Sequence, residues 1–296
     1  MTTTQTPTPL APAPVDVAGV RVPARGLRQD LRGVKVVWQR ELIRFAHDRI
    51  RIVTALMQPV LFLFVLGGGL RSLTAAATRG TSLGTLIFPG VLATTVMFTA
   101  VFSAVTIVWD REFGFLREML VAPVRRGAIV VGKSLGGATV ATIQGVLVLC
   151  LAGLVGVPYS PALLLTLLGE LLLLGFALTA FGMAIAAGIR KVQSIMGVMQ
   201  MVLMPLMFLS GALFPLANLP AWLHVLTHVN PLTYAVDPMR HTVFNHLHVT
   251  GATRAALDPG MTWLGWRVPT LLELGIVAVT GLVALAAATW RFQRIE

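Results

Sequence analysis

Long apolar runs dominate the pattern of hydrophobic and polar positions along this chain. Six of them fall at residues 52–70, 84–108, 129–156, 162–189, 194–216 and 268–290. Each can cross the hydrocarbon core of a bilayer, because a spanning α-helix needs roughly 20 apolar residues. None alternates as a barrel strand would, and a spanning segment has to satisfy its backbone hydrogen bonds internally. The pattern therefore predicts an all-α polytopic membrane protein with six transmembrane helices, kinked or locally unwound at Pro59 and Pro205.

Two different segments precede the first run. Residues 1–26 are rich in Thr, Pro and Ala without the apolar region of a signal peptide, which predicts a disordered N-terminal tail. The transmembrane domain is then expected over residues 27–296. Its first part is predicted to be a basic amphipathic helix in the membrane interface, or a helix packed on a protein partner. The apolar stripe of this helix is Leu27, Leu31, Val34, Trp38, Leu42 and Phe45.

Composition and charge agree with a membrane protein. The chain is 56% hydrophobic and 12% charged, whereas soluble domains are roughly 45–50% apolar and about 25% charged. The net charge of +11 could indicate a nucleic-acid partner. However, most of the 23 basic residues lie on one side of the predicted spans. The positive-inside rule places that side, with both termini, in the cytoplasm, so that no nucleic acid is expected as a partner.

Residues 127–134 match the phosphate-binding loop pattern G-x-x-x-x-G-K-[ST]. This loop works only between a strand and a helix. Here an arginine pair precedes the match and an apolar run continues from it, so we expect no nucleotide to bind. Instead, Gly132 and Gly136 are predicted to allow close helix packing, and Lys133 is predicted to be an anchor at the membrane interface.

The connection between the second and third runs carries the most informative stretch, WDREFGFLREMLVAP at residues 109–123. Its apolar residues Phe113, Leu116 and Leu120 share one helical face, and charges of both signs flank them. A short amphipathic helix of this kind on the cytoplasmic side is suited to docking a soluble partner. The residues alone are equally compatible with a solvated loop.

This connection, continued through the GKSLGG of residues 132–137, resembles the first cytoplasmic loop of bacterial type-2 ABC exporter permeases. Residues 210–240 resemble the other signature of that family, with the core NPLTYAVD at residues 230–237 followed by Arg240. The family usually has Ala after the aspartate, where this chain has Pro238. The resemblance covers roughly residues 28–296, and the nearest subgroup is the daunorubicin-resistance-like drug-efflux permeases.

The resemblance implies a permease subunit in the bacterial inner membrane, paired with a second permease copy or paralogue. Two copies of a separate ABC ATPase would bind from the cytoplasm, where the loop would act as a coupling helix. ATP and Mg would be bound by that ATPase, and the chain itself would hold no cofactor or metal and catalyse no reaction. The coupling residues implied are Asp110, Arg111, Glu112, Phe113, Phe115, Leu116 and Arg117. Re-entrant outer helices would carry the signature residues Asn230, Pro231, Thr233, Tyr234, Asp237 and Arg240.

Glu170 lies near the middle of the fourth run, where a charge costs about 2.5–3.5 kcal/mol on insertion scales. It is expected either to recognise a cation in the substrate pathway or to be protonated or hydrogen-bonded between helices. His224 and His228 are spaced to share a metal on one helix face, but no further ligands follow at a recognised spacing, so no metal site is predicted.

The function expected is export of a drug-like or amphipathic molecule. Two alternatives stay open. One is a permease for a polysaccharide or lipid-linked glycan, which has the same architecture. The other is a polytopic lipid-modifying membrane enzyme, for which Asp237 and the outer histidines would be the candidate groups.

Overall fold

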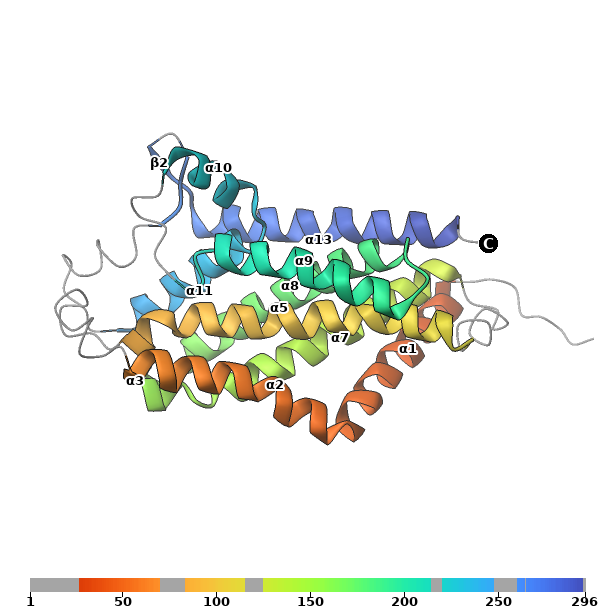
Figure 1. The fold of residues 1–296 in the computed structure, drawn as a ribbon, viewed down its shortest axis with the longest axis horizontal. Coiled ribbons are helices and arrows are strands. Elements are labelled where there is room, and N and C mark those ends of the chain that lie inside the picture. Colours follow the sequence, from red (N-terminus) through yellow and green to blue (C-terminus); the bar gives the residue numbers. More distant parts are fainter. Residues whose placement is uncertain are drawn as a thin grey trace, which may run out of the picture.

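Five long apolar helices run alongside one another through the protein (Figure 1). They are α5 (Leu83–Glu112), α7 (Arg126–Leu149), α8 (Pro161–Ala186), α9 (Val192–Leu209) and α13 (Thr270–Gln293). The computed structural model describes residues 27–69, 83–114, 125–213, 220–247, 260–263 and 265–294. Within these residues, the five helices are the ones long and apolar enough to cross a membrane. They correspond to the second to sixth predicted spans and confirm the all-α membrane architecture.

The first predicted span is a helical segment of mixed type. It consists of α2 (Arg49–Leu61), the π-helix η1 (Phe62–Leu66) and α3 (Gly67–Gly69), which follow one another without a break. The π-helix begins three residues after Pro59. Proline lacks the N–H that would bond to the carbonyl four residues earlier, so its effect is expected before Pro59 and not in the π-helix that follows. Helices α2 and α9 both stay α-helical through their prolines, Pro59 and Pro205, so neither is unwound there and a kink stays a prediction.

The amphipathic helix α1 (Leu27–His47) packs against α7 of the same chain. The packed face includes part of the predicted stripe, since Phe45 is buried and Trp38 Nε1 donates a hydrogen bond of 3.0 Å to the Thr139 hydroxyl of α7. Val37 and Glu41, which are not in the stripe, are buried as well, whereas Leu27 is 79% exposed. After α1 the chain turns sharply into α2 and forms an elbow (Figure 1). Asp48 caps α2 at this elbow, since its carboxylate accepts a hydrogen bond of 3.0 Å from the Arg51 N–H.

Helix α5 forms the centre of the bundle. Almost every residue from Gly84 to Val108 is buried, including Phe88, Leu92 and Met97. It packs against α7 and α8, and α8 packs against α13. A helix that contacts neighbours on all sides is expected to be apolar all round, as the sequence of α5 is.

Two short helices lie between α9 and α13, as the sequence predicted. Helix α10 (Ala221–Val229) exposes Trp222 and Val225, whereas α11 (Thr233–Asn245) is largely buried against α5, α8 and α13. A hairpin of β1 (Thr262–Trp263) and β2 (Trp266–Arg267) follows, which the sequence analysis did not predict. Gly265 turns this hairpin with a φ of 84°. A 3-10 turn, η2 (Ala152–Val155), joins α7 to the loop before α8.

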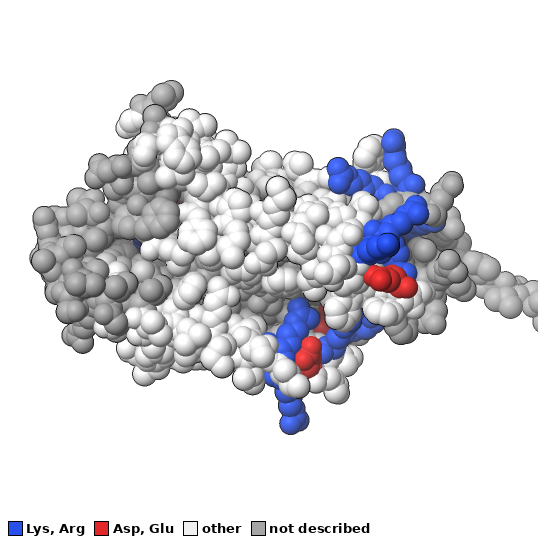
Figure 2. All heavy atoms as spheres, in the orientation of Figure 1, with Lys and Arg blue, Asp and Glu red and all other residues white. Residues whose placement is uncertain are grey.

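On the face that Figure 2 shows, the Lys and Arg side chains form two groups, one at the lower edge of the molecule and one at its right-hand end. The starts of α1 and α7 and the end of α13 meet at this end. Asp30 and Arg125 form an ion pair of 3.3 Å, and Arg126 donates a hydrogen bond of 3.2 Å to the Gln293 carbonyl. The same end carries the C-terminal part of α5, from which the predicted coupling loop begins (Figure 1). We call it the basic end.

Candidate functional site

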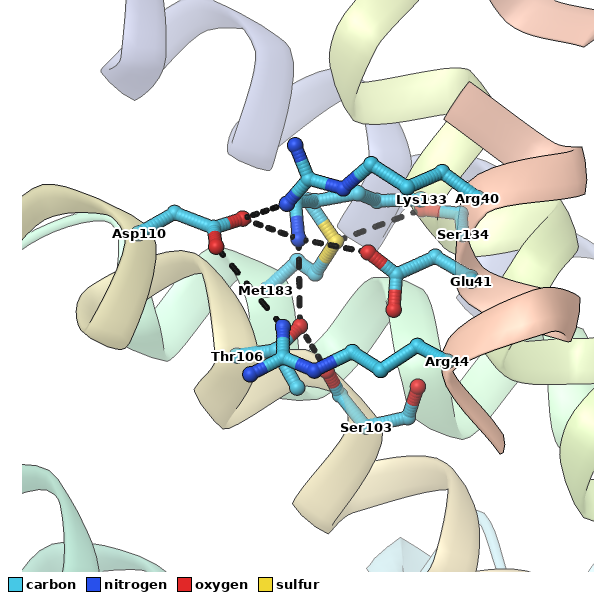
Figure 3. Close-up of polar contacts among 9 residues, drawn as sticks. All are labelled: Arg40, Glu41, Arg44, Ser103, Thr106, Asp110, Lys133, Ser134 and Met183. Carbon is cyan, nitrogen blue, oxygen red and sulfur yellow. Dashed lines mark hydrogen bonds and ion pairs between the residues drawn. The ribbon is translucent and has the colours of Figure 1, made fainter. Parts of the chain in front are cut away.

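A buried group of charged side chains joins three helices just inside the basic end (Figure 3). At its centre, the Lys133 ammonium of α7 lies 2.8 Å from Glu41 Oε1 and 2.7 Å from Asp110 Oδ2. It also donates a hydrogen bond of 3.1 Å to the Thr106 hydroxyl. The Lys133 side chain is only 3% exposed. Because two carboxylates and a hydroxyl surround this ammonium, its charge is compensated where water is excluded.

Two arginines of α1 complete the group. Arg40 Nη2 lies 2.9 Å and Arg44 Nη1 3.7 Å from the Asp110 carboxylate. Asp110 therefore shares its charge among Lys133, Arg40 and Arg44, and it ties α5 to α1 and α7. We call the five residues Arg40, Glu41, Arg44, Asp110 and Lys133 the charge cluster. Three cations face two carboxylates in it.

Two glycines allow α1 to approach α7 closely enough for these contacts. A Cβ atom at Gly132 would lie 2.8 Å from Val37 Cβ, and one at Gly136 would lie 2.7 Å from Glu41 Cβ. The predicted packing role of both glycines is confirmed. The prediction of Lys133 as an interfacial anchor is wrong, because its ammonium turns inward to the cluster. Residues 127–134 lie within α7, so the apparent phosphate-loop match is part of a helix.

The residues after Asp110 tie α5 to the turn between α8 and α9. Arg111 Nη1 donates hydrogen bonds to the carbonyls of Ala187 and Ile189, at 3.2 and 2.9 Å. Glu112 Oε2 accepts a bond of 2.7 Å from the Val192 N–H. This N–H belongs to the first turn of α9, where backbone donors have no helical partner and a carboxylate is favoured. Asp110, Arg111 and Glu112 are therefore held by contacts within the chain.

Phe113 differs from these three residues because it is 67% exposed. Its ring packs edge-on against Trp109, with 6.4 Å between the ring centroids. The remaining predicted coupling residues, Phe115, Leu116 and Arg117, lie outside the described residues. The short amphipathic helix expected there stays a prediction.

The outer signature residues hold the short helices to the bundle. Asn230 Nδ2 donates to the Leu206 carbonyl at 2.8 Å, while its Oδ1 accepts from the Leu232 N–H at 3.0 Å. The Thr233 hydroxyl donates to the Thr227 carbonyl at 2.9 Å and lies 3.3 Å from the Leu209 carbonyl. The end of α9, helix α10 and the start of α11 are therefore held together by side chains of one short motif.

The rest of the signature fixes α11 to the hairpin. The Tyr234 hydroxyl donates to the His228 carbonyl at 2.9 Å and accepts a bond of 3.2 Å from Trp263 Nε1. Asp237 Oδ2 accepts from the Met261 N–H at 2.9 Å, and Arg240 donates to the Gly211 carbonyl. Pro231 lies in the turn before α11. Each polar signature residue thus has a partner within the protein.

The two histidines of α10 lie with their ring centroids 4.2 Å apart. Both ring nitrogens of His228 are close to backbone carbonyls, Nδ1 at 2.7 Å from His224 and Nε2 at 3.0 Å from Thr262. Within the described part of the chain, no group of three or more His, Cys, Asp or Glu side chains is placed to hold a metal ion.

Glu170 of α8 is buried against α11. Its Oε1 accepts a hydrogen bond of 2.8 Å from the Thr242 hydroxyl. Its Oε2 has no hydrogen-bond partner among the described residues. The contact joins a long helix to a short outer helix, which matches the alternative of a hydrogen-bonded glutamate between helices.

Comparison with known proteins identifies the family. The sequence profile of the ABC-2 type transporter family matches residues 32–244, which extend from α1 to α11. The chain belongs to this family. It is 28% identical to the "Putative transport permease ycf38" of Cyanophora paradoxa over 69% of this chain and 72% of that protein. It is 29% identical to "Nodulation protein J" of Rhizobium leguminosarum bv. viciae over 70% of this chain and 80% of that protein.

A relative from Mycobacterium tuberculosis is named "Probable doxorubicin resistance ABC transporter permease protein DrrC". The two proteins are 28% identical over 68% of this chain and 73% of the relative. This ABC-2 permease is therefore similarly identical, at 28% or 29%, to three relatives whose names differ. The family assignment agrees with the resemblance that the sequence carried.

Sequence reasoning missed most of the charge cluster of this ABC-2 permease. Asp110 was among the predicted site residues, but Glu41 and Lys133 were not. Two signals could have indicated them. Glu41 interrupts an otherwise apolar face of α1, and Lys133 lies between two glycines at the start of an apolar run. Buried charges in a membrane protein are expected to pair with one another.

Proposed function

We propose that this permease belongs to an ATP-driven exporter, which moves a drug-like or amphipathic molecule out of the cell. A separate ABC ATPase would supply the energy. Family membership and the likeness to a doxorubicin-resistance permease support this function. The observation that carries the proposal is the position of Phe113, an exposed aromatic residue directly after three residues that are held by other helices.

This position suits the transmission of movement. Movement of a partner bound at Phe113 would be passed to several helices, because Asp110, Arg111 and Glu112 connect the end of α5 to α1, α7 and the α8–α9 turn. Exposed aromatic side chains are frequent anchors of protein interfaces. Phe115, Leu116 and Arg117 are proposed to complete the coupling surface. The ATPase would bind ATP and Mg, and this chain would hold neither.

The distribution of charge supports a cytoplasmic basic end. One of the two groups of Lys and Arg side chains in Figure 2 lies there, and the end of α13 lies at the same end (Figure 1). The positive-inside rule then orients both termini toward the cytoplasm of a bacterial cell. Two ATPase copies and a second permease copy or paralogue would complete the exporter.

Export of a polysaccharide or lipid-linked glycan is the second candidate. The chain is as similar to Nodulation protein J as to the doxorubicin-resistance permease, at 29% and 28% identity. The name Nodulation protein J states no exported molecule, so these likenesses do not decide between the two substrates. A lipid-modifying enzyme has less support, because Asp237 and His228 are engaged by backbone groups that hold the outer helices and hairpin in place.

The test is co-purification of the tagged permease from native membranes in mild detergent, followed by mass spectrometry. We expect a separate ABC ATPase at about one copy per permease, and we expect Phe113→Ala to release it. Trp222→Ala is the matched control, since Trp222 is also 67% exposed but lies on α10 away from the basic end. Absence of any ATPase from the wild-type preparation, under conditions that preserve other membrane complexes, would contradict the proposal.

A further inference from the structure

A cavity of about 410 Å³ lies between the α1–α2 elbow and α5. Helices α7 and α9 each add one residue to its lining, Gln144 and Met196. None of the residues predicted from the sequence to form a site lines it. The cavity adjoins the charge cluster, because its lining includes Arg44 of the cluster and Thr106, whose hydroxyl accepts a hydrogen bond from Lys133.

Gln144 gives this cavity an unsatisfied polar group. The side chain is completely buried, yet neither its amide nitrogen nor its amide oxygen has a hydrogen-bond partner among the described residues. Burial of an unpaired amide is unfavourable in an apolar environment. A bound molecule with a hydrogen-bonding group at this depth would satisfy the amide.

The end of the cavity opposite Gln144 carries an excess of positive charge. Arg44 and Arg51 line it together with a single carboxylate, that of Asp48. Asp48 already accepts a hydrogen bond from the Arg51 backbone. Arg44 is the most distant of the three cations that share Asp110, at 3.7 Å, and the Arg51 guanidinium forms no hydrogen bond with a described residue. Guanidinium groups that have only a long ion pair or no hydrogen bond are suited to binding phosphate, sulfate or carboxylate.

Aromatic side chains separate the two ends. Phe98 and Phe102 stack with their centroids 6.4 Å apart on the wall formed by α5, and Trp109 lies nearer the arginines. The lining residues of α5 extend from Thr95 to Trp109, which corresponds to about 21 Å along the helix. Gln144 lies at the end of the cavity near Thr95, because the adjacent Gly145 packs against Val96. The cavity is therefore long, basic at one end, aromatic along its wall and polar at the far end.

We propose that this cavity binds an amphiphile with an acidic head group. The head group would pair with Arg44 and Arg51, the apolar body would pack on Phe98 and Phe102, and a hydroxyl or carbonyl group would bond to Gln144. The cavity would be the entry site for the exported molecule. This inference therefore rests on the proposed function, and it narrows the substrate class of the exporter to acidic amphiphiles. Binding itself requires only this chain.

The test measures binding to the full chain in nanodiscs of uncharged lipid, without ATPase. The probe is a fluorescently labelled lysophosphatidic acid, compared with the same label on lysophosphatidylcholine. We expect the acidic probe to bind at least about tenfold more tightly, as a charge-assisted hydrogen bond allows. Inorganic phosphate alone is expected to compete weakly, because it lacks the apolar body. Equal binding of both lipids, or full competition by phosphate at the concentration of the probe, overturns the proposal.

Two variants with controls locate the site. Arg51→Gln is expected to weaken the acidic probe about tenfold, whereas Arg49→Gln, on the same helix but outside the cavity lining, leaves it within about twofold. Gln144→Leu is expected to raise the thermal midpoint, since it removes an unpaired amide, and yet to weaken binding by about two- to tenfold. Unchanged binding in both folded variants overturns the site. Because no ATPase is present, this failure is distinct from a failure of the co-purification that tests the exporter.

Discussion

Lys133 Nζ lies 2.7 Å from Asp110 Oδ2, and both side chains are almost completely buried. The pair joins the start of one membrane helix to the end of another. The same ammonium binds Glu41, so three helices depend on one cation at the point where the predicted coupling loop begins.

Replacement of Lys133 by methionine tests this dependence. The variant leaves the buried carboxylates of Glu41 and Asp110 without their shared cation, which is expected to cost about 3–5 kcal/mol of stability. The measurement is the thermal midpoint in detergent. Lys191→Met serves as the control because Lys191 is exposed. Addition of Glu41→Gln to Lys133→Met is expected to recover part of the loss, and equal stability of Lys133→Met and wild type would contradict the role of the cluster.

The close approach of α1 to α7 can be tested at Gly136. Gly136→Val would place its Cβ 2.7 Å from Glu41 Cβ, which the start of a side chain cannot easily avoid. We expect a loss of about 1–3 kcal/mol, as for overpacked cores. Gly197→Val is the matched control, since Gly197 is also helical but has no atom within 4 Å of its Cβ position. Similar thermal midpoints for the two variants would show that the helices do not need this glycine.

The helices could be predicted from the sequence because apolar length alone determines which segments can span a bilayer. The face that each helix turns to its neighbours could not. Glu41 and Lys133 are 92 positions apart, and their contact depends on how α1 and α7 are rotated about their axes. In α1 the apolar stripe indicated the packed face only in part: Phe45 is buried as predicted, but Leu27 is exposed and Glu41 is buried on the same face.

The candidate site was predicted as two stretches of sequence, and the structure assigns contacts within both. The outer signature was correctly placed between the last two spans, but the hydrogen bonds of Asn230 and Asp237 to distant backbone groups depend on the tertiary fold. Gln144 was not singled out at all. A single amide in an apolar run gives no signal until the absence of a partner among the described residues is seen.

Two variants of Glu112 test whether this residue contributes to coupling with the ATPase or only caps α9. Glu112→Gln keeps an oxygen that can accept from the Val192 N–H, so folding and ATPase retention are expected to stay near wild type. Glu112→Lys removes the acceptor and reverses the charge at the start of α9, which is expected to cost about 1 kcal/mol. Export by the lysine variant should fall while insertion into the membrane continues. Normal export at normal abundance would refute this prediction.

Asn230 is expected to stabilise the outer end through its two hydrogen bonds. Asn230→Ala removes the donor to the Leu206 carbonyl and the acceptor of the Leu232 N–H. The expected loss is about 2–3 kcal/mol, given roughly 1 kcal/mol or more for each buried bond. Limited proteolysis of α10 and α11 should accelerate, whereas Trp222→Ala on the exposed face of α10 should leave the rate unchanged. Equal cleavage rates for both variants would mean that other contacts hold these helices.

Two variants of Glu170 distinguish a structural role of this carboxylate from a role in the substrate pathway. Glu170→Gln keeps an oxygen to accept from the Thr242 hydroxyl and removes the ionisable group, so export and stability are expected to stay unchanged. Glu170→Leu removes the acceptor and leaves the Thr242 hydroxyl with one bond fewer, which is expected to cost about 1–2 kcal/mol. Thermal midpoints and export of a cationic and an acidic substrate are measured for both variants. Loss of cation export alone in a stable Glu170→Gln protein would instead assign this carboxylate to the substrate pathway. Unchanged export of both substrates, with only the leucine variant destabilised, identifies Glu170 as the hydrogen-bonded contact between α8 and α11.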